Sequence, residues 1–274
     1  MVIAFTKMHG CGNDFVVIDA RGFGAGVVTP ALAAAIGDRR TGVGFDQLLV
    51  IEPPPAGSDA TAFMRIRNPD GGEAGACGNG TRCVADMLAA QTGTRELTIA
   101  TVAGDLDATM LDDGAVRVDM GRPRFGWADI PLSREVDTVH LPMARDPAAC
   151  SMGNPHATVF VDDFEFDVAA VGRAMEHDPL FPERANIGFA RIDAPDQMRL
   201  RVWERTAGLT LACGSGTCAA VVNAVRRGLC ERRVRVTVDG GVLDIGYGEN
   251  GRVTMAGPVA TSFSGTLDLS RFAA

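Results

Sequence analysis

The chain contains one series of motifs twice, in the same order, and this repeat constrains its fold more than any other feature. The segment MRIRNPDGGEAGACGNGT, which starts at Met64, aligns with MRLRVWERTAGLTLACGSGT, which starts at Met198. At nearly the same offset, M-G-R-P at Met120 matches M-A-G-P at Met255. Because the order and the offset are both preserved, we interpret the chain as a duplication of one folding unit.

A chain of 274 residues is long enough for two lobes, each with its own hydrophobic core. We expect an N-terminal lobe over residues 1–125 that carries Cys77 and a C-terminal lobe over 126–274 that carries Cys213. The boundary is predicted in the stretch from Gly121 to Asp129, and the last residues of the chain are expected to cross back to the first lobe. An active site is expected in the cleft between the lobes.

Each copy of the repeat predicts strands followed by a Gly-rich loop, an apolar helix and a β-meander. Residues alternate between apolar and polar in FVVID, LLVIE, FMRIR, ELTIATV and AVRVDM, as in half-buried strands. Hairpin turns are predicted at Asp112-Asp-Gly and Glu249-Asn-Gly. The segments VADMLAA after Cys83 and AAVVNAV after Cys218 have almost no polar side, so both helices should be buried. The predicted fold class is α+β, with two pseudo-symmetric mixed-β lobes, each curled around a central buried helix.

Composition excludes several classes of function. The net charge is −8, and no basic stripe is present that would indicate a nucleic-acid partner. The N-terminal segment has neither the basic start nor the apolar run of a signal peptide, and no apolar stretch is long enough to span a membrane. The seven cysteines are odd in number and irregularly spaced, unlike those of a secreted disulfide scaffold. We therefore expect a cytoplasmic protein with reduced thiols that acts on a small molecule.

Cys77 and Cys213 occupy equivalent positions in the two copies, each before Gly-x-Gly-Thr and a buried helix. A thiol at a helix N-terminus faces unpaired backbone N–H groups and the positive end of the helix dipole, which lower its pKa. The same N–H groups can hold a carboxylate. With the two loops facing each other, one thiolate could remove a proton from Cα while the other thiol returns one from the opposite face. The pattern therefore indicates inversion at a carbon next to a carboxylate.

Other interpretations of these residues were weighed. A cysteine beside a Gly-rich turn is often only a small core residue, and Cys83 and Cys218 are assigned to that class. Zinc would need C-x2-C spacing or paired histidines, and a phosphate loop would need a lysine. Pyridoxal phosphate also needs a lysine, and Lys7 is the only one in the chain. We expect neither a metal nor a cofactor. Core positions are predicted for Met8, Met64 and Met198, a structural role for His9, and surface positions for His140 and His177.

Several longer motifs resemble those of the diaminopimelate epimerase family across essentially the whole chain. They are KMHGCGNDFVVID, GFDQLLV, RNPDGGEAGACGNGTRC, MGNPHATVF, FPERANIGF and WERTAGLTLACGSGT. The resemblance implies cofactor-independent interconversion of LL- and meso-2,6-diaminopimelate, in the biosynthesis of lysine and peptidoglycan precursors. It also implies that Cys77 and Cys213 are the acid and the base, and that His156 and Glu204 tune their acidity.

The resemblance further implies a set of substrate-binding residues, most of them amides or loop glycines. Amides can satisfy both ammonium and carboxylate groups, Arg205 can bind a carboxylate with two parallel bonds, and Glu204 can balance an ammonium. The predicted set is Asn13, Gln47, Asn68, Gly78, Asn79, Asn154, Asn186, Glu204, Arg205, Gly214 and Ser215.

Four residues depart from the family's pattern. Thr206 replaces a usual glycine, Leu209 stands where an acidic residue is frequent, Pro69 replaces a small residue, and Cys11 replaces an apolar one. None of the four is predicted to contact the sulfur atoms. Thr206 replaces a glycine next to Glu204 and Arg205, so it affects the backbone conformation there.

Three alternative functions stay open at this point. A proline or hydroxyproline racemase would share the fold and the two cysteines, but would have no use for the amide cluster. An isomerase of the phenazine-biosynthesis type would share the fold without the cysteine pair. A non-catalytic binding protein would retain the cleft alone. The sequence leaves open which cysteine is the thiolate and whether the chain forms the expected homodimer.

Overall fold

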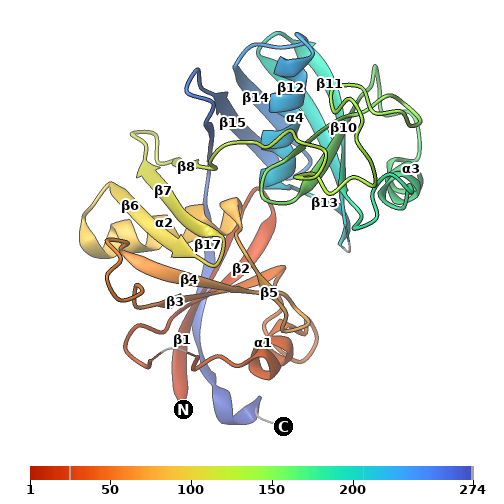
Figure 1. The fold of residues 1–274 in the computed structure, drawn as a ribbon. Helices are drawn as coiled ribbons and strands as arrows, with labels where there is room; N and C mark the ends of the chain where they lie inside the picture. The colour runs from red at the N-terminus through yellow and green to blue at the C-terminus, as the bar shows by residue number, and fades with distance from the viewer. Residues whose placement is uncertain (25, 206, 273–274) are drawn as a thin grey trace. The chain divides into compact units, whose positions relative to one another are not determined.

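The computed structural model describes residues 1–24, 26–205 and 207–272, and the chain divides into two compact units (Figure 1). Unit 1 comprises Met1–Val118 together with the chain from Gly257 onward, and unit 2 comprises Asp119–Ala256. The division lies upstream of the predicted boundary after residue 125. The reason is local pairing, since Arg124 and Ser151 exchange two backbone hydrogen bonds of 2.9 Å within unit 2.

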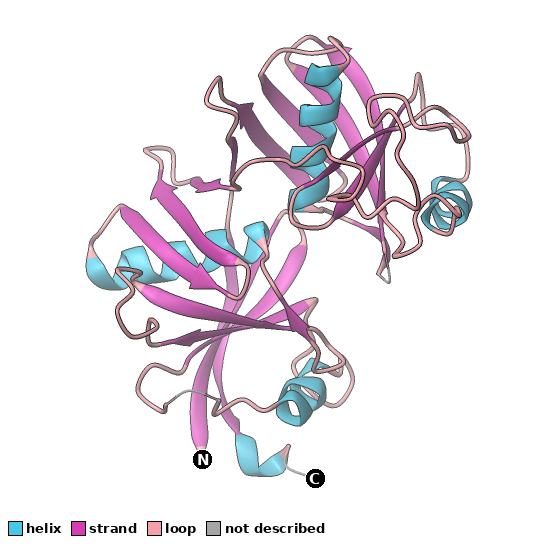
Figure 2. Ribbon diagram, in the orientation of Figure 1, coloured by secondary structure: helices cyan, strands magenta, loops and turns pink. Residues whose placement is uncertain are grey.

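Unit 1 is a set of strands with the long helix α2, the short helix α1 and a short 3-10 helix, η1, near the C-terminus (Figure 2). Its elements are β1 (Val2–Gly10), β2 (Asn13–Asp19), α1 (Pro30–Gly37), β3 (Gln47–Glu52), β4 (Ala62–Arg67), β5 (Glu73–Ala74), α2 (Gly78–Thr92), β6 (Glu96–Thr101), β7 (Gly104–Met110), β8 (Val116–Asp119), β17 (Ala260–Asp268) and η1 (Leu269–Arg271).

Unit 2 repeats the same succession of elements. They are β9 (Ala148–Ser151), β10 (Pro155–Phe160), α3 (Val168–Glu176), β11 (Asn186–Ala194), β12 (Gln197–Glu204), β13 (Gly208–Thr210), α4 (Gly214–Arg226), β14 (Arg233–Val238), β15 (Gly241–Tyr247) and β16 (Val253–Gly257).

The strand pairings of the two units match element by element. In unit 1, β1–β2, β3–β4, β6–β7 and β7–β8 are antiparallel, while β2–β3 and β4–β6 are parallel. In unit 2, β9–β10, β11–β12, β14–β15 and β15–β16 are antiparallel, while β10–β11 and β12–β14 are parallel. Two parallel crossovers at equivalent places in each unit agree with the duplication that the sequence motifs indicate, and the α+β class is confirmed.

The last strand belongs to the first unit. β17 pairs antiparallel with β1 along most of its length, for example Ile3 with Leu267 (Figure 1). Leu267 is 6% exposed and packs in a core with Phe5, Val16 and Leu48. The edge of β1 that faces away from β2 is therefore covered by the end of the chain, which removes an exposed row of backbone donors and acceptors.

Helices α2 and α4 are the buried helices that the apolar segments predict. Cys83, Val84 and Leu88 of α2 are fully buried, as are Cys218 and Val221 of α4. α2 packs on β1, β3, β6 and β7, and α4 packs on β9, β10, β11 and β15. Each helix is thus enclosed by the strands of its own unit.

The predicted positions of the three core methionines and the two surface histidines are confirmed, and the structural role of His9 stays a prediction. Met8, Met64 and Met198 are in the core, each no more than 2% exposed. The side chains of His140 and His177 are 58% and 50% exposed. His9 is partly buried in β1.

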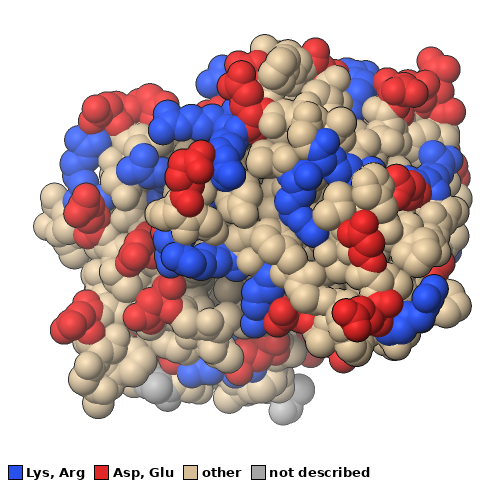
Figure 3. Space-filling model, turned by 45° about the horizontal axis from the view of Figure 1, so that its top comes forward, with Lys and Arg blue, Asp and Glu red and all other residues tan. Residues whose placement is uncertain are grey.

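The surface carries both signs of charge. On the face that Figure 3 shows, Lys and Arg side chains are interleaved with Asp and Glu. None of the helices in the described ranges has the length and apolar character needed to cross a bilayer.

The position of Leu267 predicts a large stability effect. Leu267→Ala should lower the free energy of unfolding by about 2–5 kcal/mol, because it leaves a cavity in the core of unit 1. Leu229→Ala is the matched control, since Leu229 is 41% exposed and should change stability little. Urea denaturation of both variants measures the difference, and equal losses would show that β17 is not an integral strand of unit 1.

Candidate functional site

Cys77 lies where the sequence predicts, at the N-terminus of α2. It is the N-cap residue, with φ −148° and ψ 106°, and its Sγ accepts a hydrogen bond from the Gly80 backbone N–H at 3.3 Å. The backbone carbonyl of Cys77 accepts from the N–H and the hydroxyl of Thr81 at 2.8 and 2.9 Å. A Cβ at Gly80 would lie 3.0 Å from the side chain of Leu49 in β3, so the glycine lets α2 begin close against the sheet.

Two asparagines of the predicted binding set meet beside Cys77. Asn79, in the first turn of α2, is 2% exposed, and its Nδ2 donates to Asn13 Oδ1 at 3.2 Å. Asn13 follows the two-residue turn between β1 and β2, where Cys11 and Gly12 have φ of 54° and 80°. Both central residues of that turn are left-handed, as in a type I′ hairpin. Asn13 in turn donates to Asp46 Oδ2 at 2.9 Å.

Gln47 and Asn68 form a second amide pair in unit 1. Gln47 Nε2 donates to Asn68 Oδ1 at 3.2 Å. Gln47 starts β3, next to Asp46, and Asn68 follows β4, whose Arg67 pairs with Leu48. We call Asn13, Gln47, Asn68, Cys77, Gly78 and Asn79 together the Cys77 cluster.

A charged network holds the loop that carries Asp46. Arg39 Nη2 contacts Asp14 at 2.6 Å and Asp46 at 2.9 Å, and Lys7 contacts Asp14 at 2.5 Å and the Gly44 carbonyl. Burial acts to raise the pKa of Asp14, but hydrogen bonds from Arg39 and Lys7 and their positive charges lower it to about 2. Asp14 is therefore ionised at neutral pH, and the turn before β2 is tied to the start of β3.

Cys213 is the N-cap of α4, the position equivalent to Cys77, and it is 5% exposed. Burial raises its pKa well above the ordinary value, and the negative charge and hydrogen bond of Glu204 raise it further. The Gly216 N–H and the Ser215 hydroxyl act in the opposite direction without reversing the shift. The expectation that a helix N-terminus lowers the pKa of each thiol is therefore wrong for Cys213, which is held as a neutral thiol.

His156 lies beside the same loop and is 2% exposed in β10. Its Nε2 is 2.9 Å from Asn154 Oδ1 and 3.0 Å from Ser215 Oγ, and the Ser215 hydroxyl is 3.8 Å from Cys213 Sγ. Burial, aided by the positive charge of Arg205, lowers the pKa of His156 to about 3. At neutral pH it is an uncharged imidazole.

Glu204, Arg205 and Asn186 complete the arrangement in unit 2. Glu204 Oε1 accepts from the Thr210 hydroxyl at 2.6 Å. Asn186 Oδ1 accepts from the Arg205 backbone N–H at 2.9 Å, and Arg205 Nη1 donates to the Glu183 carbonyl at 3.0 Å. We call Asn154, His156, Asn186, Glu204, Arg205, Cys213, Gly214 and Ser215 the Cys213 cluster. In unit 1, Cys77, Gly78 and Asn79 lie at the N-terminus of α2, and Asn13 is bonded to Asn79. Gln47 and Asn68 contact each other at the ends of β3 and β4. In unit 2, Cys213, Gly214 and Ser215 lie at the N-terminus of α4, and Ser215 contacts His156 and Asn154.

The structure describes three of the four departures from the family's pattern, and it explains one of them. Pro69 is exposed in a tight turn closed by hydrogen bonds between Asn68 and the glycines at 71 and 72, where its fixed φ suits the turn's second position. Leu209 is 37% exposed in β13. Cys11 is buried in the β1–β2 turn. Thr206 lies outside the described residues.

Sequence reasoning missed three residues that contact the clusters. Arg82 donates to Asn79 Oδ1 at 3.1 Å, Asp46 accepts from Asn13, and Thr210 donates to Glu204. All three stand inside motifs that are visible in the sequence, ACGNGTRC, GFDQLLV and WERTAGLTLACGSGT. Their contacts arise from the fold, so no spacing rule would have selected them.

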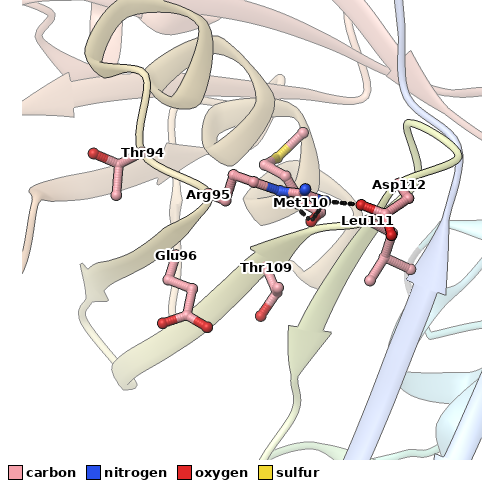
Figure 4. Close-up of a pocket in the computed structure, with 7 residues that line it drawn as sticks. All are labelled: Thr94, Arg95, Glu96, Thr109, Met110, Leu111 and Asp112. Atoms are coloured by element: carbon pink, nitrogen blue, oxygen red, sulfur yellow. Dashed lines mark hydrogen bonds and ion pairs between the residues drawn. The ribbon is translucent and has the colours of Figure 1, made fainter.

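One surface hollow of unit 1 is unrelated to either cluster. It has a volume of about 520 Å³ and is lined by residues 94–96 and 109–112, around an ion pair of 2.7 Å between Arg95 and Asp112 (Figure 4). Within the described ranges, no group of three or more His, Cys, Asp or Glu side chains is arranged to hold a metal ion.

Comparison with known proteins identifies the family that this chain matches. The family model for diaminopimelate epimerase matches residues 5–126 and 148–261. A diaminopimelate epimerase from Acidiphilium cryptum is 58% identical over 274 residues, covering 98% of both chains. Among solved structures, a PhzF-family phenazine biosynthesis protein from Bacillus anthracis matches with a TM-score of 0.70 at 16% identity, covering 97% of this chain and 99% of that one. A hydroxyproline epimerase from Agrobacterium vitis, solved with trans-4-hydroxy-L-proline, matches with a TM-score of 0.69 at 13% identity, covering 97% and 92%. The two structures establish the fold only.

A duplicated fold with a cysteine capping each central helix, together with these relatives, defines the chain as an isomerase of the racemase and epimerase class. Within that class it belongs to the diaminopimelate epimerase family.

The environment of Cys213 predicts a measurable change in thiol reactivity. Glu204→Gln removes a negative charge that raises the pKa of Cys213, so the pKa should fall and the thiolate fraction should rise. Each unit of that fall should speed alkylation by iodoacetamide about tenfold at a given pH below the pKa. Peptide mass spectrometry of Cys213 measures the rate, with Glu165→Gln, an exposed glutamate of unit 2, as the matched control. Unchanged alkylation in Glu204→Gln would contradict the assigned cause.

Proposed function

We propose that this chain interconverts LL- and meso-2,6-diaminopimelate by proton transfer at Cα, without pyridoxal phosphate or a metal, in the biosynthesis of lysine and peptidoglycan precursors. The observation that carries the proposal is the pair of cysteine N-caps, one in each unit, within a chain that is 58% identical to a diaminopimelate epimerase over nearly its full length.

In the proposed mechanism, the two clusters act on opposite faces of one carbon. Backbone N–H groups at the starts of α2 and α4 hold the substrate carboxylate next to that carbon, since helix N-termini favour anions. Cys77, as thiolate, takes the proton from Cα and becomes a thiol. The electron pair left on Cα is stabilised by the bound carboxylate group, and Cys213 then gives its thiol proton to the opposite face. The reverse reaction exchanges the two roles.

The raised pKa of Cys213 supports this assignment of the protons. A thiol that is neutral before substrate binds is the acid of the first turnover, and this leaves Cys77 as the base. Because His156 is an uncharged imidazole, it adds no positive charge that would stabilise the thiolate form of both cysteines alike.

Contacts within unit 2 support a substrate with a second amino-acid group. Glu204 and Arg205 are adjacent residues of opposite charge, and Asn154 and Asn186 are oriented by bonds to Ser215 and Pro155. We assign them to the distal ammonium and carboxylate groups. Hydroxyproline has no such distal groups, so the rival racemase function would leave these side chains unused.

The remaining parts of the proposal concern setting and assembly. We propose a cytoplasmic enzyme that binds a small-molecule substrate, not a nucleic acid, and forms a homodimer.

The proposal predicts cofactor-free exchange that depends on both sulfurs. In D₂O, the purified protein should incorporate deuterium at Cα of diaminopimelate and leave hydroxyproline unlabelled. Cys77→Ser and Cys213→Ser should each slow epimerisation about a hundredfold to ten-thousandfold, because a hydroxyl is a far weaker acid than a thiol. NMR of the substrate measures both results.

The matched control for these variants is Cys230→Ser, a half-buried cysteine beyond α4 that belongs to neither cluster. Exchange into hydroxyproline alone would favour the rival racemase. Full activity of either cluster variant would refute the two-cysteine mechanism.

A further inference from the structure

Arg82 is a buried charge that the stability of the fold does not account for. It lies in the second turn of α2 with 0% exposure, and it is among the largest fully buried side chains of the chain. Its Nη2 donates to Asn79 Oδ1 at 3.1 Å, but neither Nε nor Nη1 has a hydrogen-bond partner in the described part of the chain. A guanidinium stays protonated in proteins, and burying it without a paired carboxylate is unfavourable. An apolar side chain of similar volume would pack here at lower cost.

The neighbouring backbone is shaped around this guanidinium. A Cβ added at Gly10 would lie 2.7 Å from Arg82 Nη2, so a side chain there would force the guanidinium to move. Gly10 pairs with Asn13 across the type I′ turn. Arg82 therefore lies directly beneath the hairpin that presents Asn13, and its head group points back toward the start of α2, where Asn79 and Cys77 are.

Arg82 also decides which amide atoms of Asn79 and Asn13 donate and which accept hydrogen bonds. A guanidinium only donates, so Asn79 must turn its Oδ1 toward Arg82, which leaves its Nδ2 to donate to Asn13 Oδ1 at 3.2 Å. Asn13 must then donate from Nδ2 to Asp46, and a carboxylate only accepts. A pure donor at one end and a pure acceptor at the other leave a single orientation for both amides.

We propose that Arg82 is a positioning residue of the active site, which holds Asn79 and Asn13 in one amide orientation and supplies a permanent positive charge behind the helix N-terminus that Cys77 caps. Asp46 is the second positioning residue, at the acceptor end of the same chain of hydrogen bonds. This inference rests on the proposed function and adds two residues that do not contact the substrate.

The two effects of Arg82 can be separated by substitution. Arg82→Met removes both the charge and the directed donor. It should raise KM for diaminopimelate about tenfold, through loss of a charge-assisted hydrogen bond, and raise the pKa on the acidic limb of kcat/KM by about one unit. Arg82→Lys keeps the charge and loses the planar fork, so KM should rise while the acidic limb stays near that of the wild type. Asp46→Asn frees the orientation of Asn13 from the other end, and should raise KM with an unchanged pH profile.

The matched control is Arg95→Met, an exposed arginine of unit 1 whose partner is Asp112, and it should leave KM and the pH profile unchanged. Since Asp46 is exposed, Asp46→Asn should fold and decides the positioning role if Arg82→Met does not accumulate. Wild-type KM and a wild-type pH profile in Arg82→Met would overturn the proposal. So would equal losses in Arg82→Met and Arg82→Lys with no change in the pH profile, since that pattern marks a purely structural arginine.

A readout that needs no turnover separates this inference from the proposed function. The rate of Cys77 alkylation by iodoacetamide, followed against pH by peptide mass spectrometry, should shift to higher pH in Arg82→Met and not in Arg95→Met. That shift in a protein without activity on diaminopimelate would refute the proposed substrate and retain the electrostatic role of Arg82. An active enzyme without the shift would refute the role of Arg82 alone.

Discussion

The enclosure of a buried helix that begins at a cysteine in the N-cap position is the constraint on which the rest of each unit depends. α2 and α4 have almost no polar face, so each must be enclosed by strands, and its first turn must begin where a strand ends. The unpaired N–H groups of that first turn need acceptors in a place that water barely reaches. A sulfur at the N-cap accepts one of these bonds, as Cys77 does from Gly80, and the remaining N–H groups can meet an anionic ligand. A structural requirement of the fold thus produces a reactive group beside an anion-binding position.

Duplication gave both units this arrangement, and later divergence made the two cysteines chemically different. Cys213 lies beside Glu204 in a buried setting, which holds its proton. At the position equivalent to Arg82 in α2, α4 has Cys218, so this fully buried positive charge has no counterpart at that position in the second unit. The negative charge of Glu204 beside Cys213 favours a neutral thiol there. Under our proposal, the positive charge of Arg82 lies behind Cys77 instead. A reaction that removes one proton and returns another needs that difference at the start of each turnover.

Much of the fold could be predicted because it depends on local pattern. The repeated motifs indicated two similar units, the alternation in FVVID and LLVIE marked β2 and β3, and the apolar runs after Cys83 and Cys218 marked the buried helices. The place where the units divide could not be predicted. It depends on backbone pairing between Arg124 and Ser151, which is a product of the tertiary fold.

The residues of the candidate site could be predicted from the sequence, but their pKa shifts could not. Family motifs named residues several of which contact one another within their unit. The direction of the Cys213 pKa shift, however, depends on burial and on Glu204, which no spacing rule reports. Arg82 was passed over for a related reason. A single arginine in a helix is usually a solvated surface residue, and only its contacts beneath the β1–β2 turn give it a role.

The central claim is that the sulfurs of Cys77 and Cys213 work on one carbon, and mild oxidation of the substrate-free protein tests it most directly. Two sulfurs close enough to flank a single tetrahedral centre should join under diamide. The account predicts one new Cys77–Cys213 cross-link by peptide mapping, with epimerase activity lost in proportion and restored by dithiothreitol. Oxidised protein that keeps its activity, or that links other cysteines while these two stay reduced, would contradict it.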